Sequence, residues 1–315
     1  PGMPATKAAK RPATNPGTAK EQARSGLVIV NYSKHQLIED AAGELIRCVA
    51  RRGLEQIVCG DRVEWLPTGD GTGVIETITP RRSVLLRATG NNVSRPLVAN
   101  IDQIIIEAAL EPALDSFLID KYTIAAELAH TEPLIVINKA DLLQPDERKR
   151  IEALMREYQA IGYTTLLTSA LHNTGIEAFM DCLAHKTSIL VGQSGVGKSS
   201  LIKRLLPDHD ITVGKLSEAS GLGKHTTTAT TLYHLPHGGM LIDSPGVRDF
   251  RLGVVPAAEL AQGFREFRPC LGQCKFNDCR HLTEPGCAIN AALADGQISE
   301  RRMESYRKLL QGSDE

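Results

Sequence analysis

The sequence predicts a multidomain protein with an N-terminal β-barrel, a central α/β domain and a small C-terminal α-helical domain. Short apolar runs, separated by turn-forming residues, fill residues 26–88. Fully apolar strands alternate with helical stretches over residues 98–250, and cysteine and histidine gather among helical patterns in residues 251–315. At 315 residues the chain is long enough for two or three domains.

Residues 1–25 differ in composition from the rest. Ala, Pro, Thr and Gly dominate this segment, which cannot bury a core, so we expect a flexible basic tail. One acid, Glu21, stands there against five basic residues: Lys7, Lys10, Arg11, Lys20 and Arg24. The formal net charge of the chain is only −1, so any contact with nucleic acid must come from local patches of this kind.

The composition also indicates the cellular compartment in which we expect the protein. No apolar run approaches the roughly 18 residues that a membrane span needs, and the N-terminal residues contain no hydrophobic signal segment. Four of the seven cysteines lie between Cys270 and Cys287, a distribution typical of a metal site rather than of disulfides. We therefore expect a cytoplasmic protein with no membrane contact.

The predicted barrel occupies residues 26–88. Its strand-like runs are GLVIVNYS, ELIRCVAR, DRVEWLP and GVIETI, which suit a small closed barrel of the oligonucleotide-binding (OB) or SH3-like type. Aromatic residues are few here, Tyr32 and Trp65, so contact with structured RNA or a nucleic-acid backbone is favoured over base stacking. A β-subdomain that serves only as a spacer is the alternative. Residues 87–102, rich in Gly and Asn, are interpreted as a linker.

The central domain should contain a doubly wound, mostly parallel sheet. The predicted strands are IIIEAAL, PLIVINK, TTLLTSA, TSILVG and MLIDSPG, and the predicted helices are SFLIDKYTIAAELAH, DERKRIEALMREYQAIG, GIEAFMDCLAH and SLIKRLLP. Binding loops are then expected at the carboxyl ends of the strands.

One of these loops matches the phosphate-binding pattern G-x-x-x-x-G-K-[ST]. GQSGVGKSS follows a strand and opens a helix, which is the context that the pattern requires. Gly192, Gly195 and Gly197 let backbone N–H groups, and the helix terminus through Ser200, face phosphate oxygens. Lys198 would reach the β- and γ-phosphates, and the Ser199 hydroxyl would bind Mg²⁺.

Two loops indicate that the base is guanine. In NKAD, Asp141 can accept two hydrogen bonds from the guanine edge, while Asn138 fixes the ring and the Lys139 stem covers it. Ser169 and Ala170 follow another strand, in the type of loop whose backbone N–H meets the guanine oxygen. Together these loops favour GTP over ATP.

Switch-like elements follow the phosphate loop. Asp243 ends the strand of LIDSPG, where it can hold the Mg²⁺ shell, and Gly246 offers an N–H to the γ-phosphate. In GLGKHTTT, Thr226 or Thr227 would complete that shell and be released after hydrolysis. An ordinary polar surface loop is the alternative for this segment. The guanine motif precedes the phosphate loop, so the domain is predicted to be circularly permuted, with its last switch leading into the C-terminal domain.

These motifs make the chain similar to a known family, the circularly permuted GTPases of the RsgA (YjeQ) type. GQSGVGKSS, NKAD, GLGKHTTT, DSPGVRDF and the cysteine cluster all resemble that family's signatures, from about residue 26 to the C-terminal helix. The resemblance implies an OB-fold barrel, a P-loop GTPase domain and a zinc domain. It also implies stimulation of GTP hydrolysis by 30S subunits, and it marks His225 as catalytic. Val247 stands where many GTPases carry a water-orienting Gln, so intrinsic turnover should be slow; an idle His225 is the alternative.

The cysteine cluster has the spacing C-x4-C-x-H-x5-C, formed by Cys274, Cys279, His281 and Cys287. Such a Cys3His set suits tetrahedral Zn²⁺, and four protein ligands leave no open position, so the role should be structural. Cys270 is the rival first ligand, although the resemblance favours Cys274. Reduced cysteines without a metal are the alternative for the whole cluster.

The sequence thus predicts a Mg²⁺-dependent GTP hydrolase that acts in late maturation of the small (30S) ribosomal subunit. It would bind ribosomal RNA through the barrel and the zinc domain as a monomer, and hydrolysis would favour release, with catalytic roles for His225, Lys198 and Gly246. An RNA-binding scaffold that senses GTP or GDP with negligible turnover is the second hypothesis. A GTP switch that acts only on proteins is the third.

Overall fold

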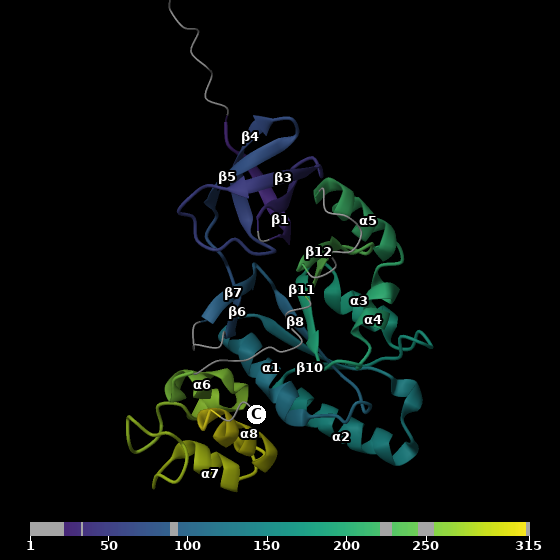
Figure 1. Ribbon diagram of the computed structural model, residues 1–315. Helices are drawn as coiled ribbons and strands as arrows, with labels where there is room; N and C mark the ends of the chain where they lie inside the picture. Colours follow the sequence, from purple (N-terminus) through teal and green to yellow (C-terminus); the bar gives the residue numbers. More distant parts are fainter. Residues whose placement is uncertain (1–21, 33, 89–93, 221–228, 245–254, 313–315) are drawn as a thin grey trace, which may run out of the picture.

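A computed structural model describes residues 22–32, 34–88, 94–220, 229–244 and 255–312. Figure 1 shows three parts in a row: a β-barrel at the top, an α/β sheet in the middle and a group of C-terminal helices at the bottom. Most of the predicted basic tail lies outside the described residues. Within the described parts of the chain, no helix is both long and apolar enough to cross a membrane.

The barrel is built from β1 (Arg24–Asn31), β2 (Gln36–Asp40), β3 (Leu45–Ala50), β4 (Arg62–Gly69) and β5 (Thr72–Ile78). The strand order is β1-β2-β3-β5-β4, and a β1–β4 pairing closes the barrel. Only the β3–β5 pair is parallel. This closed five-stranded arrangement is that of an OB-fold, so the fold predicted for these residues is confirmed.

Trp65 fills the centre of the barrel and is only 2% exposed. A Cβ added at Gly73 would lie 2.5 Å from its ring, so glycine gives the indole the room it needs. The core around Trp65 is apolar, with Val28, Ile38 and Ile75 among its members. The single tryptophan of the chain is therefore a packing residue and not a platform for bases.

β6 (Val84–Ala88) and β7 (Ser94–Ala99) pair with each other as two antiparallel strands. The interpretation of residues 87–102 as a linker is therefore wrong for residues 87–88, which end β6, and for residues 94–99, which form β7. Pro96 lies inside β7, and proline is compatible with a strand at the edge of a sheet, as in this two-stranded pair. Leu85 of β6 and Val98 of β7 bury their side chains in the main core and so anchor this pair of strands.

The central sheet contains β8 (Gln103–Ala108), β9 (Glu132–Ile137), β10 (Thr164–Leu167), β11 (Thr187–Gly192), β12 (Thr231–His234) and β13 (Met240–Asp243). The order is β10-β9-β8-β11-β13-β12, and every pair is parallel except β12–β13. The five predicted strands are all confirmed, and β12 is an additional strand. β11, which precedes the phosphate loop, lies in the middle of the sheet although it comes fourth along the chain.

Helices cover this sheet where their periodicity predicts them. They are α1 (Ser116–Leu128), α2 (Pro145–Ile161), α3 (Ile176–Leu183) and α4 (Lys198–Leu205), with a short 3-10 turn, η1 (Ala140–Leu142). Asp115 caps α1 by accepting from the backbone N–H groups of Phe117 and Leu118, and Gly162 ends α2 in the left-handed conformation. A further helix, α5 (His209–Ser220), had not been predicted.

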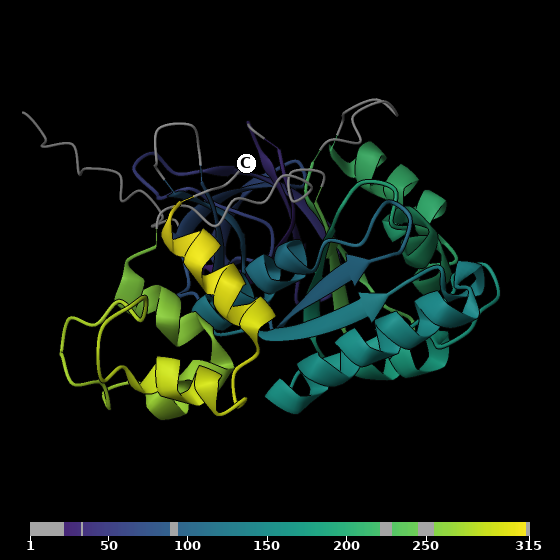
Figure 2. The same cartoon turned by 90° about the horizontal axis from the view of Figure 1, so that it is seen from below.

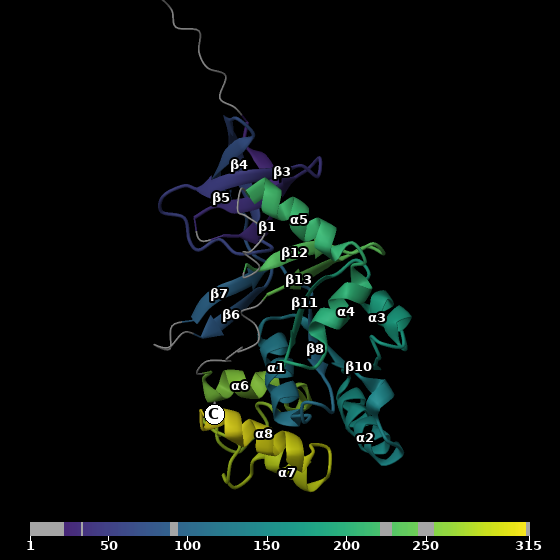
Figure 3. The same ribbon diagram turned by 45° about the vertical axis from the view of Figure 1, so that its right-hand side comes forward.

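The barrel and the central sheet are hydrogen-bonded into one continuous sheet. β12 pairs with β1 through Thr231 and Val30, so that eleven strands follow one another in order. Helix α5 packs against β2 and β3 of the barrel, and Figure 3 shows α5 lying beside the barrel. His234 Nε2 of β12 lies 2.8 Å from Glu39 Oε2 of β2. The barrel is thus held by two elements of the central domain.

The C-terminal segment is helical, as predicted. It consists of α6 (Ala257–Gly263), a 3-10 helix η3 (Arg265–Cys270), α7 (Ala288–Ala294) and α8 (Glu300–Leu310). In its core Phe264 stacks on Phe267, and Tyr306 meets both rings edge-on. Ile124 of α1 belongs to the same cluster. In Figure 2 these yellow and lime helices lie on the opposite side of the view from the green α5.

A buried charge cluster joins the C-terminal helices to α1. Asp120 of α1 is fully buried and accepts hydrogen bonds from Arg301 Nη1 at 2.7 Å and Arg302 Nη1 at 2.8 Å. It also accepts from Tyr158 Oη and Ser305 Oγ, both at 2.6 Å. Arg302, itself fully buried, donates through its Nε to Glu266 Oε1 at 2.6 Å. These bonds fix the C-terminal helices on the central domain.

Candidate functional site

The parallel strands bring most of the predicted motifs to one edge of the sheet. Gly192 ends β11, Asn138 follows β9, Thr168 follows β10 and Asp243 ends β13. Because parallel strands run in one direction, their carboxyl ends and the loops after them meet at the same edge. Residues that are between 24 (Thr168 to Gly192) and 105 (Asn138 to Asp243) positions apart in the chain therefore lie along the same edge of the sheet.

The phosphate loop curls in the way its glycines permit. Gly192, Gly195 and Gly197 have φ angles of 147°, 86° and 122°, values that residues with a Cβ rarely adopt. Space is also limiting, because a Cβ on Gly192 would lie 2.1 Å from the Glu107 carbonyl oxygen and one on Gly197 would lie 2.2 Å from Asn138 Nδ2. Gly192 thus lets the phosphate loop pack closely against β8, and Gly197 lets it pack closely against the loop that contains Asn138.

Lys198 is the first residue of α4, and its ammonium folds back over the loop. Its Nζ donates to the carbonyl of Gly192 at 2.8 Å and also to that of Gln193. Ser199 and Ser200 follow in the exposed first turn of the same helix. The loop and the start of α4 thus present backbone N–H groups, a cation and two hydroxyls at one place, which is what an anionic phosphate chain requires.

Asn138 ties three loops together and is only 2% exposed. Its Nδ2 donates to Glu107 Oε1 at 2.9 Å and to the Val196 carbonyl of the phosphate loop at 3.3 Å. Its Oδ1 accepts from Ala170 N and from Thr168 Oγ1, both at 3.3 Å. Both ends of the amide are used in bonds to protein, so the structure gives Asn138 a bracing role beside the ring contact predicted for it.

The residues predicted to face guanine surround this brace. Lys139 has a left-handed backbone conformation and donates from Nζ to the Glu111 carbonyl at 2.8 Å. Asp141 is exposed, and its Oδ1 accepts from the Ser169 hydroxyl, which lowers the pKa of the carboxyl. Arg204 Nε, from α4, fixes the last loop by donating to the Ala170 carbonyl at 2.7 Å. An ionised hydrogen-bond acceptor is therefore held at the exposed side of these loops.

Glu107 was not among the predicted site residues, although it lies at the centre of this arrangement. It occupies the carboxyl end of β8 and is only 1% exposed. Burial raises its pKa to about 7, although Asn138, Lys198 and Lys139 all act to lower it. A glutamate within the otherwise apolar run IIIEAAL was the only sign in the sequence.

Asp243 lies at the carboxyl end of β13 and is half-buried, in register with Thr231 of β12. Beside it, the hydroxyls of Ser244 and Thr230 lie 2.8 Å apart. The remaining predicted switch and catalytic residues lie outside the described parts of the chain. They are His225, Thr226, Thr227 and Gly246, together with Val247.

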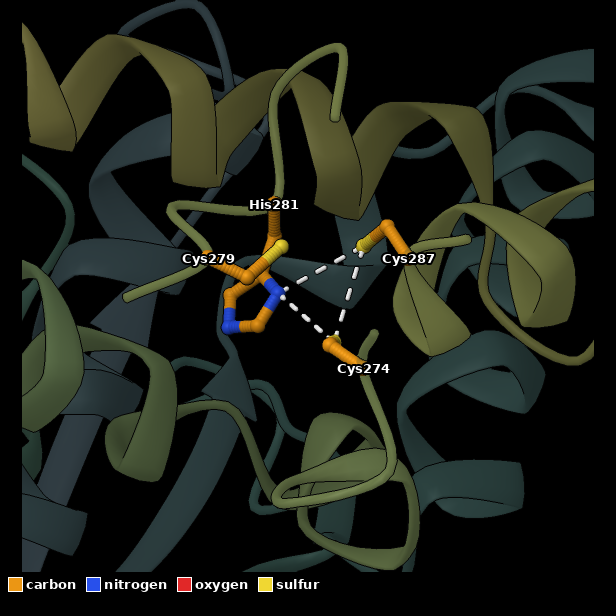
Figure 4. Close-up of side chains that lie close together, drawn as sticks. All are labelled: Cys274, Cys279, His281 and Cys287. Carbon is orange, nitrogen blue, oxygen red and sulfur yellow. Dashed lines mark hydrogen bonds between the residues drawn. The ribbon is translucent and has the colours of Figure 1, made fainter. Parts of the chain in front are cut away.

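The predicted metal ligands converge in the C-terminal segment, as Figure 4 shows. The ligand atoms of Cys274, Cys279, His281 and Cys287 all lie within 4.8 Å of one another. Cys274 Sγ and Cys287 Sγ are 3.9 Å apart, and each lies 3.5 Å from His281 Nδ1. A tetrahedron with Zn–S bonds of about 2.3 Å has edges of about 3.8 Å, so the donor set fits a zinc ion.

The surroundings of the cluster also suit a metal. Burial lowers the pKa of His281, which favours the neutral imidazole that a metal requires, and raises the pKa of the Cys279 thiol to about 12. Deprotonated thiols would therefore need a cation beside them. Cys270, the rival ligand, ends η3 and is not part of the group of four.

The fold and site define a class of protein: a P-loop domain with guanine-type loops, whose motifs come in a permuted order along the chain. Comparison with known proteins agrees. The family described as RsgA GTPase matches residues 78–253. The chain belongs to this RsgA GTPase family.

Individual relatives extend the match over most of the chain. The small ribosomal subunit biogenesis GTPase RsgA of Sodalis glossinidius is 47% identical, covering 92% of this chain and 86% of the relative. The protein of the same name from Haemophilus influenzae is 45% identical over 93% of this chain and 86% of its own length.

Solved structures show the same architecture. The crystal structure of YjeQ from Thermotoga maritima superposes with a TM-score of 0.77 at 34% identity, over 92% of this chain and 98% of that one. YloQ, described as a circularly permuted GTPase, gives a TM-score of 0.73 at 26% identity, over 95% and 97% of the two chains. The predicted circular permutation is thus confirmed.

Proposed function

We propose that this protein hydrolyses GTP during late maturation of the small (30S) ribosomal subunit and that hydrolysis drives its release from the subunit. The proposal that the protein binds and hydrolyses GTP is supported chiefly by Asn138, whose side chain makes hydrogen bonds to both the phosphate loop and the loop that contains Ala170. The ribosomal part is supported by relatives that bear the name small ribosomal subunit biogenesis GTPase over more than nine-tenths of the chain.

The residues divide into three tasks. Asp141 accepts from the guanine edge, while a backbone N–H of the loop that holds Ser169 and Ala170 faces the guanine oxygen and Lys139 covers the ring. Lys198, the phosphate-loop N–H groups and Gly246 N–H neutralise the β- and γ-phosphates. Ser199, Asp243 and one of Thr226 and Thr227 would hold Mg²⁺, which would supply further neutralisation of phosphate charge.

Water activation is assigned to His225. Val247 follows the DxxG glycine, so the usual Gln is missing and an imidazole near the switch is the candidate for orienting the attacking water. Slow intrinsic turnover follows from this, and binding to the subunit would complete the site.

The other parts are assigned to recognition. The division into a tail (1–25), barrel (26–88), GTPase domain (98–250) and zinc domain (251–315) gives two RNA-contacting ends on either side of a nucleotide switch. Zn²⁺ would hold Cys274, Cys279, His281 and Cys287 together as a structural site. The protein acts as a monomer, in the cytoplasm where bacterial ribosomal subunits mature.

The test is steady-state GTP hydrolysis with and without purified small ribosomal subunits, for wild type, Lys198→Ala and His225→Ala. Lys203→Ala is the matched control, because Lys203 is an exposed lysine on the same helix, α4. We expect strong stimulation by subunits for wild type and Lys203→Ala, and loss of that stimulation in the other two variants.

Other results would change the assignment. Subunit binding without stimulation of the wild type would favour the nucleotide-sensing scaffold, a reading that Val247 supports. Binding of GTP with no salt-dependent binding to ribosomal particles would favour a switch that acts on proteins.

A further inference from the structure

Glu107 is a buried acid placed directly beneath the phosphate loop. Register pairs it with Gly192, the first glycine of that loop, on one side and with Val136 of β9 on the other. A Cβ added at Gly197 would lie 3.0 Å from Glu107 Oε1, so the carboxyl group lies against the last glycine of the loop as well. The side chain thus lies close to both ends of the loop that holds phosphates.

The two carboxyl oxygens of Glu107 are in different situations. Oε1 accepts from Asn138 Nδ2 at 2.9 Å. Oε2 is buried and has no hydrogen-bond partner within the described part of the chain. An ionised carboxylate with one bare oxygen is costly in such a place, whereas a protonated carboxyl keeps the bond to Asn138 and carries an O–H donor.

Few charges compensate Glu107. The cations that act on it are Lys198, from α4, and Lys139, from the loop after β9. Strand β11 carries no ionisable side chain, and Glu132 of β9 lies at the opposite end, paired with Lys186 at 2.9 Å.

Helix α1 packs on β8, but its charged side chains are either paired with other residues or buried. Asp120 and Glu127 are bound by arginines of the C-terminal segment, and Lys121 is 8% exposed. Burial therefore prevails over the two lysines and raises the pKa of Glu107 to about 7.

We propose that Glu107 is a proton-linked positioning residue, which takes up a proton from solvent as nucleotide phosphates bind, so that nucleotide affinity falls as pH rises through neutrality. This inference rests on the proposed GTP site. The phosphates bring negative charge next to a buried carboxylate, and Lys198 turns from compensating Glu107 to binding them. The neutral acid still accepts from Asn138, and thereby keeps the guanine-type and phosphate loops aligned.

The expected size of the pH effect on nucleotide affinity follows from the fraction of Glu107 that is protonated. With a pKa of about 7, roughly nine-tenths of Glu107 is protonated at pH 6 and roughly one-tenth at pH 8. If only the protonated form binds well, apparent affinity falls in proportion to that fraction. We expect nucleotide affinity to drop about tenfold from pH 6 to pH 8 through this group.

The experiment is a fluorescence titration of the full chain with N-methylanthraniloyl-GDP and Mg²⁺ at pH 6, 7 and 8. Wild type is compared with Glu107→Gln, which keeps a carbonyl acceptor for Asn138 but cannot ionise. Glu132→Gln is the matched control on the neighbouring strand. Comparison between variants cancels the titration of the nucleotide's own phosphate.

We expect wild type and Glu132→Gln to lose about tenfold more affinity than Glu107→Gln between pH 6 and pH 8. Equal pH slopes in all three variants, or a steeper loss in Glu107→Gln, would overturn the inference while leaving the GTP site intact. Failure of the wild type to bind at any pH would overturn both proposals.

A second measurement needs no variant, in case Glu107→Gln does not fold. Infrared difference spectroscopy of the wild type at pH 8 should show the C=O band of a protonated carboxyl appearing when GDP binds. Binding without that band would overturn the inference.

Discussion

Replacement of Arg302 by Met should weaken the attachment of the C-terminal helices to the central domain. The loss of stability should exceed that caused by substitution of any exposed residue on the same helix, α8. Met fills much of the arginine's volume but leaves Asp120 and Glu266 without its guanidinium. Asp120 keeps three other donors, Arg301, Tyr158 and Ser305. Glu266 loses both bonds that Arg302 makes, at 2.6 and 3.1 Å.

The magnitude can be set from burial. Arg302 and Asp120 are fully buried, and removal of one partner from a buried ion pair costs about 3–5 kcal/mol. The matched control is Lys308→Met, also on α8, whose ion pair with Glu304 is exposed. Exposed pairs of this spacing contribute about 0.3–0.5 kcal/mol.

The assay is urea unfolding with two probes. Far-UV circular dichroism follows the helices, whereas fluorescence of Trp65, the single tryptophan, follows the barrel. We expect Arg302→Met to lower the free energy of unfolding in the helical transition by about 3 kcal/mol or more and to leave the Trp65 transition in place. A loss below about 1 kcal/mol, or an equal loss in Lys308→Met, would refute the idea that this buried cluster holds the segment.

Three other predictions concern the nucleotide and metal sites. Gly197→Ala should reduce GTP binding at least tenfold, because its Cβ would collide with Asn138 and its φ is positive. Gly214→Ala, on α5 with no atom near the added Cβ, should leave GTP affinity unchanged. Nucleotide titration of both variants measures the two affinities. Cys274→Ser should reduce bound zinc from one equivalent to less than half, while Cys270→Ser keeps it, as measured by metal analysis of the purified chains. Asp141→Asn should weaken GTP binding at least tenfold and favour XTP, since the amide can donate to the second carbonyl of xanthine. A competition experiment in which the variant still prefers GTP to XTP would contradict this prediction.

The sequence was most informative where one local pattern decides the structure. Continuous apolar runs such as TSILVG predicted the buried parallel strands, and the glycine and lysine spacing predicted the phosphate loop. Spacing predicted a zinc-type cluster, because residues 274–287 are close in the chain, and the family resemblance favoured Cys274 over Cys270 as its first ligand. Local signals of this kind need no knowledge of the fold.

Elements that depend on distant partners were missed. Helix α5 contains Gly214 and a β-branched run at Ile211–Val213, so its periodicity is weak, and it packs on a barrel that is remote in sequence. β7 contains Pro96, which argues against a strand until an edge position is known.

The side-chain partnerships at the site and in the C-terminal cluster were missed for the same reason. Asp120 and Arg302 are 182 residues apart, and no pattern in the sequence pairs them. Likewise, only the order of the strands shows that Glu107 lies under the phosphate loop.

The permuted strand order has a consequence for synthesis on the ribosome. β8, β9 and β10 emerge first and can pair with one another, but the other edge of β8 must wait for β11. β8 ends at residue 108 and β11 begins at residue 187, so about 80 residues, or roughly 4–16 seconds of translation, separate them. During that interval the nascent chain presents an unpaired apolar edge, where the charge of Glu107 would discourage other chains from adding a strand.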